Sequence, residues 1–159
     1  MTKLTFILND ESVINSYGFQ ILSSGGKLQR FLDNPVMLSN HLNTNENVIG
    51  KWENVKLQDG KIMADSNFDQ GSELAIEIAG KVDRGYLKGA SMGIIPNWDS
   101  MIDMGGQLML TEWELAEASI VPVPSNRNSI AIYSADGKLL IQEDVKSLCL
   151  SIQEKIYKP

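Results

Sequence analysis

Short runs in which apolar and polar residues alternate recur along the chain and predict many short strands. We expect these strands at residues 2–8, 17–23, 36–38, 51–57, 62–68, 86–95, 129–133 and 138–141, with one or two more over residues 108–121. Polar residues and glycines separate the runs, and residues 96–106 are expected to form a polar loop.

Local signals add a hairpin and two helices to this pattern. Asp59 and Gly60 lie between two alternating segments, and such a pair tolerates the positive φ angles of a hairpin turn. Ser72 precedes apolar residues at helical spacing, which predicts a capped helix that ends at Gly85. A last helix over residues 144–157 places five residues on one apolar stripe, Val145, Leu148, Cys149, Ile152 and Ile156.

The order of these elements favours one fold class. Strands joined mostly by turns indicate a mainly β domain, with a largely antiparallel sheet or barrel and about two helices packed outside it. A doubly wound parallel fold is disfavoured. The 159 residues fit a single domain over residues 1–159, and no internal repeat or linker interrupts them.

Composition and charge remove several classes of partner. Hydrophobic residues make up 43% and charged residues 21% of the chain, which is usual for a folded soluble domain. The 14 basic and 20 acidic residues give a net charge of −6 without a basic cluster, so nucleic acid is not an expected partner. Because no apolar stretch has the length of a membrane span and residues 1–8 are too weakly apolar for a signal peptide, we expect an intracellular protein without a membrane partner.

One histidine, His41, and one cysteine, Cys149, limit the available chemistry. A disulfide within the chain is excluded, and a Cys/His zinc cluster would lack ligands. Asp99 and Asp103 lie in a loop without the ligand spacing of a cation site, so we expect no metal and no cofactor. Cys149 is expected to be a buried small hydrophobic residue.

Residues 89–93 read Gly-Ala-Ser-Met-Gly and match the Gly-x-Ser-x-Gly pattern of the α/β-hydrolases. That fold is not expected, because more strand-like sequence follows Ser91, the only histidine precedes it, and the chain is short. A serine hydroxyl still needs a base during nucleophilic attack, and His41 has the only side chain with a suitable ordinary pKa. The rival base, Lys88, would point to the opposite face of the strand from Ser91.

Structural interpretations of both positions stay open at this point. A lone histidine near a loop is often a surface residue or a structural hydrogen-bonding residue. Glycines around a serine on a strand often mark only close backbone packing. A catalytic role for His41 and Ser91 therefore needs support from a third residue that is identified independently.

Glu117 is that third position. Alternation with period two places it on the same strand face as Trp113, Leu115, Ser119 and Val121. A carboxylate among apolar neighbours is costly without a partner, so we expect a dedicated donor, for which the imidazole of His41 is one candidate. An ion pair with a lysine or arginine is the other.

Together these positions resemble the caudovirus prohead protease family, which shares a clan with the herpesvirus assemblins. The similarity runs from about residue 17 to residue 133. Residues 34–41 and 49–52 look like the family's "Pro, apolar run, His, then Ile-Gly-basic-aromatic" segment, and residues 87–94 look like its serine segment. Residues 114–126 are similar to its "Leu-x-Glu-x-Ser-x-Val, then Pro-Ala-Asn" signature, although Ser125 stands where alanine is usual and Asn40 precedes His41 where another residue is common.

The resemblance implies a serine endopeptidase with a compact antiparallel β-barrel ringed by helices. Such enzymes work inside the assembling phage head in the host cytoplasm, where they cleave scaffold segments, the major capsid protein and often themselves. By analogy with the assemblins we also expect self-association through the last helix.

The resemblance also assigns roles to the site residues. Ser91 would be the nucleophile, His41 the general base and acid, and Glu117 the acid that orients His41. Backbone N–H groups around Asn126 and Arg127, with the Arg127 side chain, would form the oxyanion hole. Two alternatives remain, a catalytically inactive capsid-assembly or scaffold module with the same fold, and an esterase.

Overall fold

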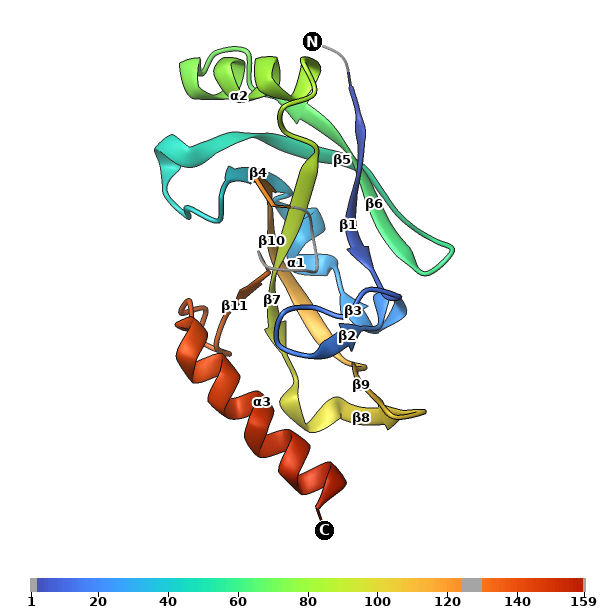
Figure 1. The fold of residues 1–159 in the computed structure, drawn as a ribbon. Helices are drawn as coiled ribbons and strands as arrows, with labels where there is room; N and C mark the ends of the chain where they lie inside the picture. Colours follow the sequence, from blue (N-terminus) through green and yellow to red (C-terminus); the bar gives the residue numbers. More distant parts are fainter. Residues whose placement is uncertain (1–2, 124–129, 159) are drawn as a thin grey trace.

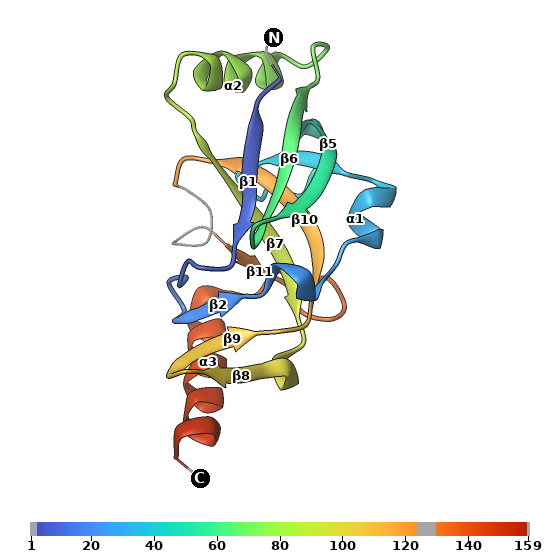
Figure 2. The same ribbon diagram turned by 90° about the vertical axis from the view of Figure 1, so that its right-hand side faces the viewer.

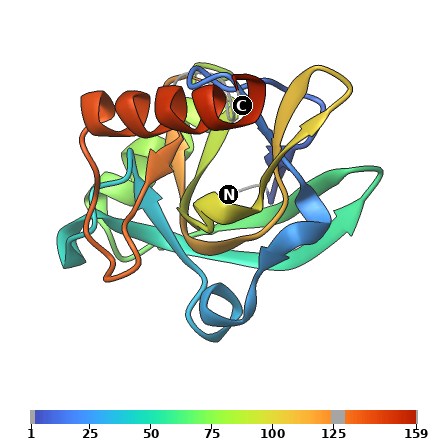
Figure 3. The ribbon, with the colours of Figure 1, turned by 90° about the horizontal axis from the view of Figure 1, so that it is seen from below.

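The computed structural model describes residues 3–123 and 130–158. Within these residues the protein is mainly β, with a strongly curled mixed sheet of eight strands, a small sheet of three strands and three α-helices (Figure 1). Seen from below, the strongly curled large sheet forms a half-barrel (Figure 3). The expected mainly β class with flanking helices is confirmed.

The large sheet has the strand order β1-β6-β5-β4-β10-β7-β11, with β3 paired to β10. Its strands are β1 (Thr5–Asp10), β3 (Gly26–Lys27), β4 (Val36–Ser39), β5 (Val48–Gln58), β6 (Lys61–Phe68), β7 (Gly89–Pro96), β10 (Trp113–Val121) and β11 (Ala131–Ile132). The small sheet, β2 (Phe19–Ile21), β9 (Gln107–Leu110) and β8 (Met101–Met104), lies below it in Figure 2. The helices are α1 (Gln29–Asp33), α2 (Glu73–Asp83) and α3 (Gln142–Tyr157).

The sheet is mixed rather than largely antiparallel. β10 pairs antiparallel with β7 but parallel with β4, and β11 pairs parallel with β7. The β5–β6 hairpin, α2, β7 and the small-sheet strands β8 and β9 all lie between β4 and β10 in the chain. Such a long connection can bring a strand back in either direction, so turn signals alone do not fix its sense.

The locally signalled elements are confirmed. β5 and β6 form the expected hairpin, and Asp59 and Gly60 take φ angles of 52° and 74° at its turn. α2 begins after Ser72, whose Oγ accepts the N–H of Ala75 at 3.2 Å. α3 covers the expected last helix and begins two residues earlier, at Gln142.

Two expectations need correction, and one helix was not predicted. Residues 96–106 are not simply a loop, because they contain a 3-10 turn (Trp98–Ser100) and β8, which forms a hairpin with β9 across a glycine pair. α1 was not expected. Residues 138–141 form no strand and contribute one bridge, between Leu139 and Tyr133.

The core lies inside the curl of the large sheet. Trp52 and Trp113 are among its largest buried side chains, and the Trp52 indole N–H donates to the carbonyl of Ala118 at 3.1 Å. Val145 and Cys149 of α3 are buried against this core, so the fold itself covers most of the apolar stripe of that helix. No helix within the described residues is long and apolar enough to span a membrane.

Candidate active site

β4 ends in a turn that carries His41. Asn40 and His41 both take positive φ angles, 50° and 62°, which non-glycine residues rarely adopt. Two hydrogen bonds to β10 hold this turn: the N–H of Asn40 donates to the carbonyl of Ile120, and the N–H of His41 donates to Ser119 Oγ, each at 3.0 Å. The turn therefore brings the imidazole back toward β10.

A β-bulge in β10 decides which way Glu117 points. Leu115 pairs with Ile94 and Glu117 pairs with Gly93, so one residue of β10 is unmatched between them. Four side chains of β10 join the core, Trp113 and Leu115 before the bulge and Ala118 and Ile120 after it. The expectation that Glu117 shares a face with Trp113 and Leu115 is wrong, because the bulge shifts the alternation; Glu117 and Ser119 share the opposite face.

β7 presents Ser91 on this same face. Ala90, Met92 and Ile94 of β7 enter the core, so Ser91 and Gly93 point the other way. Ser91 lies directly opposite Ser119 in the antiparallel pair, and such partners have neighbouring side chains. Three neighbouring strands thus bring His41, Glu117 and Ser91 to one face of the sheet.

Gly93 leaves the space that the carboxylate occupies. A Cβ atom at Gly93 would lie 2.1 Å from Glu117 Oε1 and 2.6 Å from a ring carbon of Tyr133. The second glycine of the Gly-x-Ser-x-Gly pattern is therefore a close-packing glycine. The expected close neighbour was backbone, whereas the atoms that pack on Gly93 belong to the side chains of Glu117 and Tyr133.

The imidazole donor expected for Glu117 is present. His41 Nδ1 lies 2.5 Å from Glu117 Oε1, and the two side chains are only 12% and 7% exposed. We assign the proton of this contact to Nδ1, with the carboxylate oxygen as the acceptor. No lysine or arginine contacts Glu117 among the described ion pairs.

Two further hydroxyl groups contact the carboxylate. Ser119 Oγ donates to Glu117 Oε2 at 2.8 Å, and the Tyr133 hydroxyl lies 3.4 Å from Oε1. Burial, and then the negative charge of Glu117, raise the pKa of the Tyr133 phenol well above its usual range. Tyr133 therefore stays a neutral hydrogen-bond donor. Neither residue was predicted to belong to the site, although Ser119 follows Glu117 at the spacing of one strand face.

Ser91 is fully buried, and its Oγ makes no hydrogen bond to the residues that the structure describes. Its hydroxyl is not committed to a structural contact, whereas the Ser119 hydroxyl donates to Glu117 and accepts from the backbone of His41. Catalytic hydrogen bonds in ligand-free enzymes are often long and tighten when substrate binds. Of the two serines on this face, Ser91 is the one whose hydroxyl can serve as a nucleophile without breaking the support of Glu117.

Other expected positions lie elsewhere. Lys88 is exposed and precedes β7. Asp103 accepts the Tyr157 hydroxyl at 2.8 Å, and no group of three or more metal-ligating side chains occurs among the described residues. Cys149 is buried, as expected. The candidate oxyanion residues Asn126 and Arg127 lie outside the described residues.

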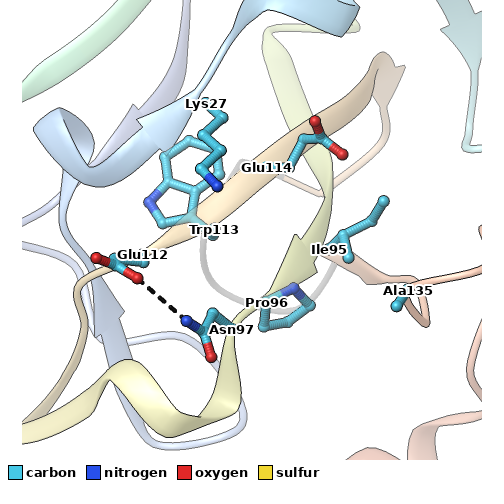
Figure 4. A pocket seen from close by; sticks show the side chains of 8 residues that line it. All are labelled: Lys27, Ile95, Pro96, Asn97, Glu112, Trp113, Glu114 and Ala135. Carbon is cyan, nitrogen blue, oxygen red and sulfur yellow. Dashed lines mark hydrogen bonds between the residues drawn. The ribbon is translucent and has the colours of Figure 1, made fainter.

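A hollow of about 260 Å³ lies apart from this cluster, at the start of β10 (Figure 4). Its lining includes Trp113, with the Lys27 side chain beside the indole, and Asn97, which donates to Glu112 at 3.1 Å. None of His41, Ser91 or Glu117 lines it.

Comparisons of this chain with protein-family models, with curated proteins and with solved structures gave no match.

Proposed function

We propose that this protein is a serine endopeptidase in which Ser91 is the nucleophile, His41 the general base and acid, and Glu117 the group that orients His41. The observation that supports this most strongly is the 2.5 Å contact between His41 Nδ1 and Glu117 Oε1, on a sheet face that also carries Ser91. A buried imidazole with one nitrogen held by a carboxylate is the base half of a serine-protease triad.

The reaction would proceed by acyl transfer. His41 Nε2 takes the proton of Ser91 as Oγ attacks the scissile carbonyl, and Glu117 stabilises the imidazolium that forms. His41 then returns the proton to the leaving amine, which leaves an acyl group on Ser91. A water molecule, activated by the same nitrogen, hydrolyses that ester and restores the enzyme.

The remaining parts of this proposal come from the resemblance to the prohead proteases. One is the closed, assemblin-like barrel, for which the curled half-barrel sheet is the supporting observation. Another is the oxyanion hole, for which we propose the backbone N–H groups of Asn126 and Arg127 as donors. Scaffold segments and the major capsid protein would be the substrates, in the host cytoplasm inside the assembling prohead, without a cofactor.

Self-association through α3 stays part of the proposal. Leu148 and Leu150 of this helix are 39% and 60% exposed, whereas Val145 and Cys149 are buried by the fold itself. A second copy would therefore contact the outer side of α3 rather than the whole stripe.

Co-expression with the cognate capsid and scaffold proteins tests the function. Wild type should shorten these proteins, as read by intact mass, whereas Ser91→Ala and His41→Ala should not. Ser66→Ala is a matched control, because Ser66 is also a buried strand serine but lies on β6. Cleavage by a folded Ser91→Ala protein would remove Ser91 from the mechanism.

A fluorophosphonate probe separates the alternatives. It should label Ser91 in wild type and fail to label the His41→Ala variant. No labelling and no cleavage by folded wild type would favour a catalytically inactive assembly module. Turnover of small esters without peptide cleavage would favour an esterase.

A further inference from the structure

We propose that Ser119 is a positioning residue that holds Glu117 and the backbone of His41 in one fixed geometry. The inference deepens the proposed function and rests on it for the catalytic consequence. Its structural part, that one hydroxyl sets the orientation of the imidazole, is testable without any turnover.

The Ser119 hydroxyl closes a ring of hydrogen bonds. It donates to Glu117 Oε2 at 2.8 Å, Glu117 Oε1 meets His41 Nδ1 at 2.5 Å, and the N–H of His41 donates back to Ser119 Oγ at 3.0 Å. The ring connects β10 with the turn that follows β4. Each carboxylate oxygen therefore has its own donor, which fixes the rotation of the carboxylate plane.

The backbone of His41 depends on this contact. Asn40 and His41 are consecutive non-glycine residues at positive φ, a conformation that costs free energy and persists only where neighbouring groups hold it. The N–H of His41 points to Ser119 Oγ in that conformation. Ser119 thus acts at both ends of the histidine, on its backbone directly and on its ring through Glu117.

Burial makes the arrangement sensitive to loss of the hydroxyl. Ser119 is fully buried and Glu117 is 5% exposed. In Ser119→Ala, water cannot easily replace the lost partner, so the carboxylate loses one fixed donor and the His41 N–H loses its acceptor. The expected result is an imidazole that no longer holds one orientation and one tautomer.

The chain offers a direct readout because His41 is its only histidine. A nitrogen-15 NMR spectrum of histidine side chains contains one imidazole, whose two nitrogen shifts report the tautomer. A strongly deshielded proton signal reports the short bond between Nδ1 and Glu117. Wild type should show one tautomer, protonated at Nδ1, together with that proton signal.

The variants are Ser119→Ala, Ser119→Cys and the control Ser66→Ala. Ser119→Ala should lose the deshielded proton signal and show averaged tautomer shifts, whereas Ser66→Ala should match wild type. Ser119→Cys keeps a side chain of similar size but a weaker donor, so it should show a partial loss, and it decides the matter if Ser119→Ala does not fold. Wild-type imidazole signals in a folded Ser119→Ala or Ser119→Cys protein would overturn the proposal.

Kinetics add a second readout once cleavage is measured. The Ser119 hydroxyl is engaged by Glu117 and by the backbone of His41, so we expect Ser119→Ala to lower kcat by about tenfold to a hundredfold, with KM nearly unchanged. An unchanged kcat, or a loss confined to KM, would refute the positioning role while leaving the protease proposal intact. If Ser119→Ala changes the imidazole signals but the wild-type protein has no peptidase activity, the ring of hydrogen bonds is supported and the proposed function is refuted.

Discussion

Glu117→Gln is the most informative single substitution in the proposed site. The change keeps the volume of the side chain and removes its charge, at a position where the carboxylate is 2.5 Å from the imidazole and only 7% exposed. The amide can offer an N–H where the carboxylate could only accept. His41 would then be free to place its proton on the other nitrogen, which is the nitrogen needed to accept the proton of Ser91.

The expected size of the effect follows from the general strength of buried, charge-assisted hydrogen bonds. A buried hydrogen bond between charged groups is worth about 1.5–3 kcal/mol, and each 1.36 kcal/mol is about tenfold in rate, so the lost support of the imidazolium costs about tenfold to a hundredfold. A wrong tautomer adds to this loss, and roughly 10⁴-fold is the scale for an acid-to-amide change in a serine triad. We expect kcat/KM to fall by about 10² to 10⁴.

The assay measures turnover and thermal unfolding on the same preparation. Ser119 can still donate to the amide oxygen of the substituted side chain, so the melting temperature should change little. Glu114→Gln is a matched control, because Glu114 lies on the same strand and pairs with Arg30 at 3.3 Å, but its side chain is 28% exposed. Near-normal turnover per folded molecule with a lowered melting temperature would show that Glu117 is a structural ion-pair residue, and the triad would be wrong.

Three further predictions concern separate parts of the molecule. Gly93→Ala should abolish cleavage and lower the melting temperature, because its Cβ would overlap Glu117 Oε1; an active, equally stable variant would contradict the packing described here. Ser72→Ala removes the cap that accepts the N–H of Ala75 and should lower the free energy of unfolding by about 1 kcal/mol, as measured by urea denaturation, without changing activity. Burial raises the pKa of the Cys149 thiol to about 11, so at pH 8 iodoacetamide should label the unfolded chain much faster than the native protein; equal rates would show that α3 opens readily.

The parts of the fold that the sequence predicts are those with local causes. Asp59 and Gly60 define a hairpin through the φ angles they tolerate, and Ser72 begins a helix through its own side chain. The parallel pairing of β4 with β10 has no such local signal, because it depends on how a connection of more than seventy residues packs. β8 was missed because its polar, glycine-bearing surroundings are typical of a loop.

The contact between Glu117 and His41 was one of two predicted outcomes. The cost of burying an unpaired carboxylate required a donor, which could be the His41 imidazole or a lysine or arginine, and the structure places His41, 76 residues away, beside Glu117. Ser119 and Tyr133 were not found, because neither is charged and a buried hydroxyl has many structural uses. The spacing of Ser119, two residues after Glu117 on one strand, was the available signal for its shared face.

The bulge in β10 explains why Glu117 was selected as a candidate site residue although its predicted strand face was wrong. Strict alternation would put Glu117 beside Trp113 and Leu115 in the core, where a carboxylate would be costly. One unmatched residue after Leu115 reverses the side-chain faces, as a one-residue shift in register does, so Glu117 points away from the core while Ala118 enters it. The same irregularity aligns Glu117 with Gly93, the one residue type that leaves room for the carboxylate. The proposed chemistry therefore depends on a backbone feature that a pattern of apolar and polar residues does not encode.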